Sequence, residues 1–112
     1  MGVSDFKVIE PRSFDLTGTG SKDIKFELEE DVAAGSRSVL AFRVKTDGSK
    51  LKLKFEIDGD LLFDQEFEAS ERSWHDVVQA GVLDKDSTLK VTKLAGAGKI
   101  TVSNIVLYYQ RG

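Results

Sequence analysis

The stretch Leu51-Lys52-Leu53-Lys54-Phe55-Glu56-Ile57 places an apolar residue at every second position. This alternation is typical of a β-strand with one buried and one solvated face, because successive side chains of a strand point to opposite sides. Asp58-Gly59 follows directly and indicates a turn. The same period recurs on both sides of this stretch, whereas helical periodicity is nearly absent.

The neighbouring segments extend the pattern into a fold prediction. Residues 24–28, 40–44 and 89–91 alternate in the same way, and residues 100–109 close the chain. In that last segment, the apolar residues before and after Ser103-Asn104 fall on opposite faces of the strand. A bulge near Ser103-Asn104 would turn both sets toward the core. With the shorter segments included, we expect about eight or nine strands and an all-β, antiparallel, jelly-roll-like β-sandwich.

The turn after Ile57 raises a question of register. A two-residue loop would place Asp60 and Asp64 on the buried face of the hairpin. A three-residue loop, Asp58-Gly59-Asp60, would instead pair Phe55 with Phe63, and a slip of one residue reverses every side chain. The burial pattern therefore favours the three-residue loop.

Composition limits the class of protein. The chain has 112 residues, one Pro, no Cys and a net charge of −3. We expect a single domain, residues 1–112, held by packing rather than by disulfides or a cysteine-bound zinc. The acidic balance is evidence against nucleic acid or an anionic membrane as a partner.

Targeting signals are weak in this sequence. The N-terminus lacks the basic start and apolar run of a secretory signal, and the longest apolar runs are Val39–Phe42 and Ile105–Tyr109. Both are far shorter than the roughly 20 residues that span a bilayer. We expect a cytoplasmic protein, or a secreted one if a signal segment has been removed.

Catalytic patterns are missing. His75 is the only histidine, and Asp76 beside it would point to the opposite face of a strand. Gly96-Ala97-Gly98-Lys99 and Thr17-Gly18-Thr19-Gly20 both fail the phosphate-binding patterns. We therefore expect no enzyme activity.

Two carboxylate pairs could hold a metal ion. Asp58 and Asp60 form one pair, and Asp84 and Asp86 the other, each spaced two residues apart in a turn. Calcium takes clustered oxygen ligands of this kind, although Asp-Gly and Asp-x-Asp are also ordinary turn chemistry. Calcium is the one cofactor that the sequence suggests, and the alternative is no cofactor.

A basic stripe is the least routine feature. If Asp47-Gly48 turns a hairpin, five cations share its solvated face: Arg43, Lys45, Lys50, Lys52 and Lys54. Like charges directly across a strand pair destabilise it. Either acids from neighbouring strands, with Glu27, Glu29 and Glu56 as candidates, neutralise the stripe, or it receives an anionic partner.

The aromatic residues suggest a ligand surface. Seven of the ten are Phe, a core residue, which leaves Trp74, Tyr108 and Tyr109. The two consecutive tyrosines must point to opposite faces of a strand, so one of them faces outward. Trp74 lies near a strand start and is assigned either to the core or to a ligand.

From Leu51 to Tyr109 the chain resembles the galactose-binding-like jelly-roll sandwiches that include many carbohydrate-binding modules. The matching run comprises Lys54–Gly59, the Trp-led strand Ser73–Val77, then Leu89–Val91 and the final strand Ile100–Tyr108. The resemblance implies a non-catalytic, carbohydrate-binding or lectin-like module.

Five residues are the candidate ligand contacts, namely Trp74, His75, Tyr108, Arg43 and Lys52. The alternative function is that of a structural or assembly protein, or of an interaction domain in a larger complex. Its partner would then be another protein or a second copy of the chain.

Overall fold

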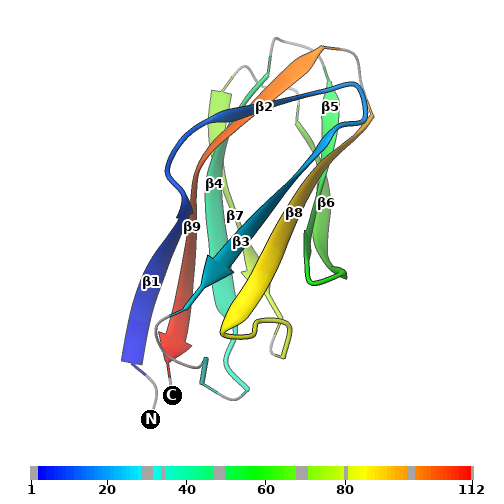
Figure 1. Ribbon diagram of the computed structural model, residues 1–112. Coiled ribbons are helices and arrows are strands. Elements are labelled where there is room, and N and C mark those ends of the chain that lie inside the picture. The colour runs from blue at the N-terminus through cyan, green and yellow to red at the C-terminus, as the bar shows by residue number, and fades with distance from the viewer. Residues whose placement is uncertain are drawn as a thin grey trace.

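The computed structural model describes residues 3–28, 32–33, 35–46, 50–67, 71–79, 81–95 and 98–111. Within these ranges the chain forms nine strands and no helix (Figure 1), which confirms the predicted all-β sandwich. The strands are β1 (Val3–Glu10), β2 (Phe14–Thr17), β3 (Ser21–Glu27), β4 (Ser38–Thr46), β5 (Leu51–Ile57), β6 (Asp60–Phe67), β7 (Glu71–Val78), β8 (Asp86–Ala95) and β9 (Lys99–Arg111). The described ranges hold no helix of the length and apolarity needed to cross a membrane.

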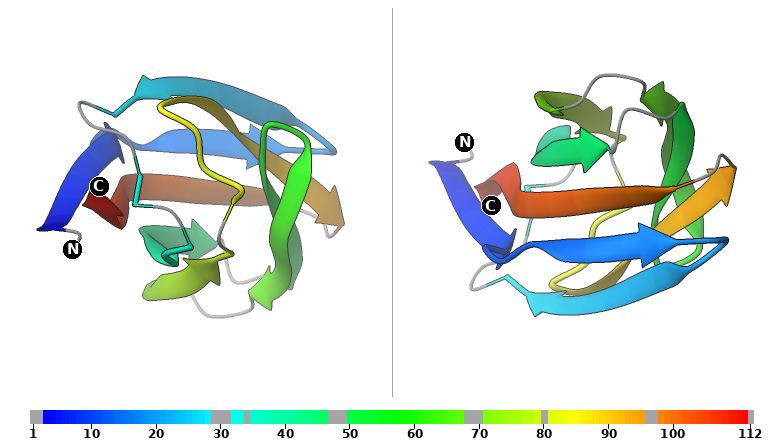
Figure 2. Two further views of the ribbon diagram at one scale, coloured as in Figure 1. Left: turned by 90° about the horizontal axis from the view of Figure 1, so that it is seen from below. Right: turned by 90° about the horizontal axis from the view of Figure 1, so that it is seen from above.

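The strands lie in two antiparallel sheets that pack face to face (Figure 2). Sheet A has the order β1-β9-β4-β7, and β2 also pairs with β9; sheet B has the order β3-β8-β5-β6. From β2 onward the chain changes sheet at every connection except that between β5 and β6. Each sheet therefore has an inner face toward the other and an outer face toward solvent.

Stacked phenylalanines fill the space between the sheets. Phe42 of sheet A lies 4.4 Å from Phe55 of sheet B, and Phe55 lies 4.8 Å from Phe63, measured between ring centroids. Phe42 and Phe55 are almost fully buried. Large aromatic side chains bury much apolar surface each, so this cluster accounts for the Phe-rich composition of a chain without cysteine.

Pro11 separates the first two strands, as its missing backbone donor predicts. The backbone N–H of Arg12 donates to the Glu10 carboxylate at 3.1 Å. This hydrogen bond stabilises the ionised acid and lowers the pKa of Glu10. β1 and β2 can then pair one after the other with the long strand β9.

The bulge expected near Ser103-Asn104 is present. Asn104 has a φ of 53°, and the register of β9 against β4 shifts between Ala41 and Arg43. As a result both Val102 and Ile105 are buried. In a regular strand, residues three positions apart would point to opposite faces. The bulge lets one strand contribute both of its apolar sets to the core.

The β5–β6 turn corrects the predicted loop length. Asp58 and Gly59 both have positive φ, 49° and 87°, and strand pairing resumes at Asp60, so the loop has two residues. The three-residue prediction was wrong because a two-residue loop with this backbone matches the twist of the strands. A register shift farther along still brings Phe55 opposite Phe63, so the expected pair is retained.

The predicted hairpin between residues 38–46 and 51–57 does not form. β4 belongs to sheet A and β5 to sheet B, so the connection crosses between sheets; Asp47 and Gly48 themselves lie outside the described residues. Both strands carry a continuous apolar face, and these faces meet across the core, as the contact of Phe42 with Phe55 demonstrates. The two halves of the basic stripe therefore lie on different sheets.

A buried lysine holds the connection between β2 and β3. Lys93 lies on the inner side of β8 and is only 1% exposed. Its Nζ donates to the carbonyl of Gly18 at 2.9 Å, and its backbone N–H donates to the carbonyl of Gly20. The hydrogen bonds compensate part of the cost of burying a cation.

Candidate functional site

The outer face of sheet A exposes large apolar side chains. Phe6, Val8, Val77 and Tyr108 are between 40% and 60% exposed, and all four lie on this sheet. Where one face of an antiparallel sheet is exposed to solvent, the residues on that face are normally polar. Contiguous exposed apolar surface usually indicates a binding site.

Cross-strand register places these side chains next to one another. Val39 of β4 is paired with Val77 on one side and with Tyr108 on the other, and Tyr108 is paired with Phe6. Directly opposed residues point to the same side of a sheet. A second row runs parallel to this one and comprises His75, Ala41, Val106 and Val8. We call these two rows together the apolar face.

A hollow opens at the end of the apolar face that lies near the start of β1. Its volume is about 290 Å³, and its lining residues are Asp5, Arg37, Val39, Tyr108, Tyr109 and Gln110. The Tyr108 ring, half exposed, lies 6.4 Å from the Phe6 ring with a tilt of 40°. We call this cavity the Tyr108 hollow; it combines an aromatic ring with a guanidinium and a carboxamide.

Backbone contacts hold the rim of the Tyr108 hollow in place. The N–H of Ala33 donates to the carbonyl of Gln110 at 2.7 Å, which ties the segment before β4 to the end of β9. On the other side, the Asp5 carboxylate accepts from the N–H of Phe6 at 2.8 Å. Ordered strands position the lining side chains, which favours a preformed site.

Three of the five predicted ligand residues lie on the outer face of sheet A. Tyr108 faces outward, whereas Tyr109 is buried, as strand alternation requires. His75 is exposed in the second row of the apolar face. Arg43 lies beyond it on the same face, where its guanidinium donates to Glu71 at 2.6 Å.

Trp74 lies on the inner side of β7, paired with Phe42. Its ring meets Phe67 edge-on at 5.4 Å, and the guanidinium of Arg72 covers it at 5.2 Å. Trp74 therefore belongs to the aromatic cluster between the sheets. Its indole Nε1 is buried without a hydrogen-bond partner.

Lys52, the fifth predicted ligand residue, lies on sheet B and not beside Arg43. Its Nζ is 4.0 Å from the Asp64 carboxylate. Two further cations of the predicted stripe have similar partners, since Lys50 pairs with Glu66 at 3.1 Å and Lys54 with Glu56 at 3.3 Å. With Arg43 paired to Glu71, four of the five cations have an acidic partner, and of the acids expected, Glu56 takes part.

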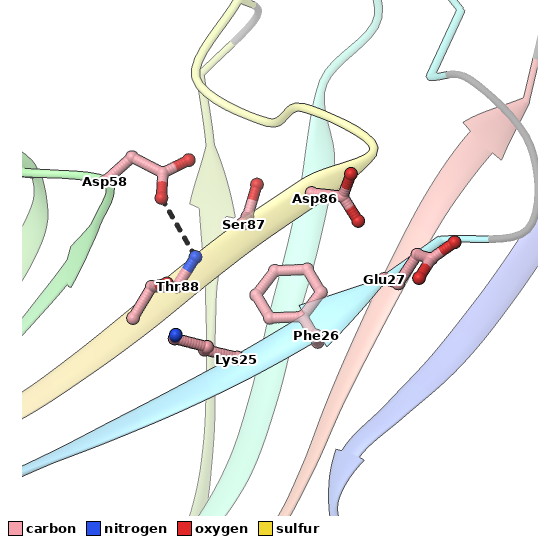
Figure 3. Close-up of a pocket in the computed structure, with 7 residues that line it drawn as sticks. All are labelled: Lys25, Phe26, Glu27, Asp58, Asp86, Ser87 and Thr88. Carbon is pink, nitrogen blue, oxygen red and sulfur yellow. Dashed lines mark hydrogen bonds between the residues drawn. The ribbon is translucent and has the colours of Figure 1, made fainter.

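The four predicted metal ligands are not gathered into one site. Asp58 and Asp86 line a second hollow, of about 330 Å³, with Lys25 and Glu27 also in its wall (Figure 3). The Asp58 carboxylate accepts from the N–H of Thr88 at 2.9 Å, which is a turn-stabilising contact.

The other two acids are not among the residues known to line this second hollow. Asp60 begins β6, and Asp84 lies in the connection before β8, where its backbone contacts Ser87. Among the described residues, no group of three or more acids or histidines is arranged to hold a metal ion.

Sequence reasoning missed Phe6, Val8, Arg37, Val39 and Gln110. The signal that could have found Val39 is an apolar run in which both alternating sets are apolar, as in residues 39–42. In such a strand one alternating set of apolar side chains is buried in the core, and the other set is either exposed to solvent or covered by another molecule.

Comparison with known proteins shows a fold but no close relative. No protein-family model matches the sequence, and no curated protein matches it. The structure of dimeric latent PorU from Porphyromonas gingivalis is similar with a TM-score of 0.69 and 13% identity. That match covers 98% of this chain but only 13% of the PorU chain.

Two carbohydrate-binding modules match over 98% of both chains. One is the CBM36-1 domain of a multidomain xylanase from the hindgut metagenome of Trinervitermes trinervoides, with a TM-score of 0.59 and 12% identity. The other is a CBM36 module in complex with calcium and xylotriose, with a TM-score of 0.54 and 9% identity. The chain therefore has a carbohydrate-binding-module-like β-sandwich fold, as its sequence resemblance implied.

Proposed function

We propose that the protein is a non-catalytic binding module that holds a carbohydrate in the Tyr108 hollow and along the apolar face. The observation that carries this proposal is a half-exposed Tyr108 ring beside Arg37 and Gln110 in one cavity. Ligand sites typically join an apolar surface to a few convergent polar groups.

The chemistry of the hollow suits a sugar ring. A pyranose presents C–H groups on its faces and hydroxyls around its rim, so an aromatic ring can contact the face. Arg37 supplies donors, and Gln110 supplies both donors and acceptors, for hydroxyl groups. An extended oligosaccharide would continue over the apolar face toward His75 and Arg43.

The lining favours binding over hydrolysis. Glycoside hydrolysis generally uses two carboxyl groups on either side of the scissile bond. Of the residues known to line the Tyr108 hollow, Asp5 is the one carboxylate. The sugar-binding structures with the same fold add support, although fold alone does not carry function.

Calcium is not part of the proposed binding mode. The CBM36 neighbour contains calcium, but here Asp58 caps a backbone N–H and shares its hollow with Lys25. These residues do not fit a calcium site, which needs several convergent oxygen ligands. We expect a chelator to leave carbohydrate binding unchanged.

Calorimetric titration with neutral and acidic oligosaccharides tests the proposal. Tyr108→Ala should weaken binding about tenfold or more, which is the loss expected for an exposed aromatic contact at the centre of a site. Leu61→Ala is the matched control, because Leu61 is equally exposed but lies on sheet B. A flat response of the unmodified protein to every sugar, or equal affinities for the two variants, would overturn the proposal.

A second candidate function is self-assembly through the same surface. Aliphatic residues, Val8, Val39, Val77 and Val106, make up much of the apolar face, and protein interfaces have apolar centres. Sedimentation at increasing concentration separates the two candidates. A dimer that Val77→Lys dissociates would favour assembly, whereas a monomer that binds sugar would exclude it.

A further inference from the structure

Sheet A has an open edge on each side. β1 and β2 border it on one side and β7 on the other, and among the described residues each of them pairs with one neighbouring strand (Figure 1). An edge strand turns every second backbone N–H and C=O away from its neighbour, and another chain can pair with these groups. The first row of the apolar face reaches both edges, from Phe6 on β1 to Val77 on β7.

At each edge a carboxylate covers the backbone donor of the apolar residue that ends this row. On β1 the N–H of Phe6 donates to the Asp5 carboxylate at 2.8 Å. On β7 the N–H of Val77 donates to the Asp76 carboxylate, also at 2.8 Å. Hydrogen bonds to a charged acceptor are stronger than those between neutral groups. Each N–H is therefore already engaged and less able to pair with an incoming strand.

The two aspartates occupy equivalent positions in the sheet. Asp5 is paired with the buried Tyr109, and Asp76 is paired with the buried Leu40. Directly opposed residues point to the same side of a sheet, so both carboxylates lie on the inner side of sheet A at its borders. Charged side chains that point inward on an edge strand oppose strand addition, because a new strand would help to bury them. We call Asp5 and Asp76 the edge aspartates.

Other features close the remainder of the β1–β2 edge. Pro11 has no backbone N–H, and the N–H of Arg12 donates to the Glu10 carboxylate at 3.1 Å. The pairing of β1 with β9 is irregular between Val8 and Glu10. Proline and bulges on an edge strand disfavour pairing with another chain. The regular part of β1, before Val8, is then the stretch of this edge on which a strand can add.

We propose that the edge aspartates keep the open edges of sheet A from pairing with a strand of a second copy of this chain. A second copy is the partner that they exclude, because edge-to-edge pairing would continue the apolar row from one copy into the next. Phe6, at the β1 end of that row, is 60% exposed, and exposed apolar edge strands are sites of association. The proposal concerns the edges of the sheet and does not depend on the proposed function.

Amide hydrogen exchange followed by NMR tests the two hydrogen bonds directly. In Asp5→Ala the Phe6 amide, and in Asp76→Ala the Val77 amide, should exchange about tenfold faster, because a hydrogen bond to a charged group is lost. The rates are corrected for local sequence and measured at low protein concentration, where the variants stay dissociated. Asp5→Asn keeps an acceptor oxygen at the same place, so its Phe6 amide should exchange much as in the unmodified protein.

Sedimentation at increasing protein concentration tests the consequence for assembly. The double variant Asp5→Ala, Asp76→Ala should associate, and its average mass should rise about twofold or more above that of the unmodified protein, since a pair of copies is the smallest edge-to-edge assembly. Should the double variant not fold, each single variant repeats the test at one edge.

A matched control separates the lost hydrogen bonds from the lost charge. The double variant Asp15→Ala, Asp64→Ala also changes the net charge from −3 to −1, since it too removes two carboxylates. The described contacts of Asp15 and Asp64 are with side chains and not with backbone N–H groups. This control should keep the mass of the unmodified protein at every concentration.

The inference fails if the Phe6 and Val77 amides exchange equally fast with and without the edge aspartates. It fails also if the double variant of the edge aspartates keeps the mass of the unmodified protein, or if the control associates to the same extent. A Phe6 amide that exchanges as fast in Asp5→Asn as in Asp5→Ala would likewise contradict it. Because no carbohydrate is present in these measurements, a failure of the proposed function would leave their outcome unchanged.

Discussion

The two outer faces of the sandwich follow the same strand alternation but differ in chemistry. On sheet B the outward residues of β5 are Lys52, Lys54 and Glu56, and salt bridges join them to one another and to β6. On sheet A the outward rows of β4 and β9 are largely apolar, and Tyr108 is half exposed. Only the charged face is suited to permanent contact with water.

This difference separates a structural requirement from a functional one. Packing between the sheets needs apolar residues on the inner faces alone, and sheet B meets that need with polar side chains outside. The outer apolar residues of sheet A contribute little to that core, so their presence is consistent with the proposed binding surface. Substitutions in the shared core and on each outer face test this difference in chemistry.

The largest effect is expected in the core that both faces share. Phe55→Ala removes a fully buried ring that stacks on Phe42 and Phe63. The loss of burial and the cavity left behind should lower the free energy of unfolding by about 3–5 kcal/mol. Denaturant unfolding measures it; Leu61→Ala, an exposed apolar site, should change stability by about 0.5 kcal/mol or less.

A smaller loss is expected at the turn that holds β6 against β5. Gly59 has a φ of 87°, a conformation that side chains disfavour, so Gly59→Ala should cost about 1–2 kcal/mol. Thermal or urea unfolding measures this loss. Asp60→Ala beside it serves as the control, and equal stabilities of the two variants would contradict the two-residue turn.

On the apolar face, Val77→Lys should affect binding rather than folding. Val77 is 40% exposed, so the free energy of unfolding should stay within about 0.5 kcal/mol. Carbohydrate affinity should fall several-fold, because a lysine disturbs the row that contains Tyr108. A stability loss much larger than this would mean that the apolar face belongs to the core and not to a site.

The smallest effect is expected on the charged face. Lys50 and Glu66 pair at 3.1 Å with both side chains more than half exposed. A double-mutant cycle of Lys50→Ala and Glu66→Ala should give a coupling of about 0.2–1 kcal/mol that falls with salt. Neither variant should alter carbohydrate affinity; a clear loss of affinity would move the site to sheet B.

Local pattern predicted the strands well but could not assign them to sheets. Alternation and the bulge at Ser103-Asn104 follow from the residues themselves, because the core side of each strand is apolar. Whether β4 and β5 form a hairpin or face each other across the core depends on tertiary packing. The basic stripe therefore seemed continuous in the sequence although its two halves are on different sheets.

The candidate site was only partly predictable for the same reason. Tyr108 follows from the rule that consecutive strand residues face opposite ways. Gln110, two residues farther along β9, shares the outer face with Tyr108 by the same rule. Arg37 joins them only because β4 pairs with β9, a contact that places Val39 opposite Tyr108. No local pattern in the sequence encodes that contact, and the inner position of Trp74, paired with Phe42, likewise depends on tertiary packing.

Amide NMR mapping of a bound oligosaccharide tests the central claim most directly, since it compares the two faces in one experiment. Saturable shifts are expected at Val39, Tyr108 and Gln110 on sheet A, with the outer face of sheet B unperturbed. Shifts centred on Lys52 and Lys54, or no saturable shifts on sheet A, would contradict it.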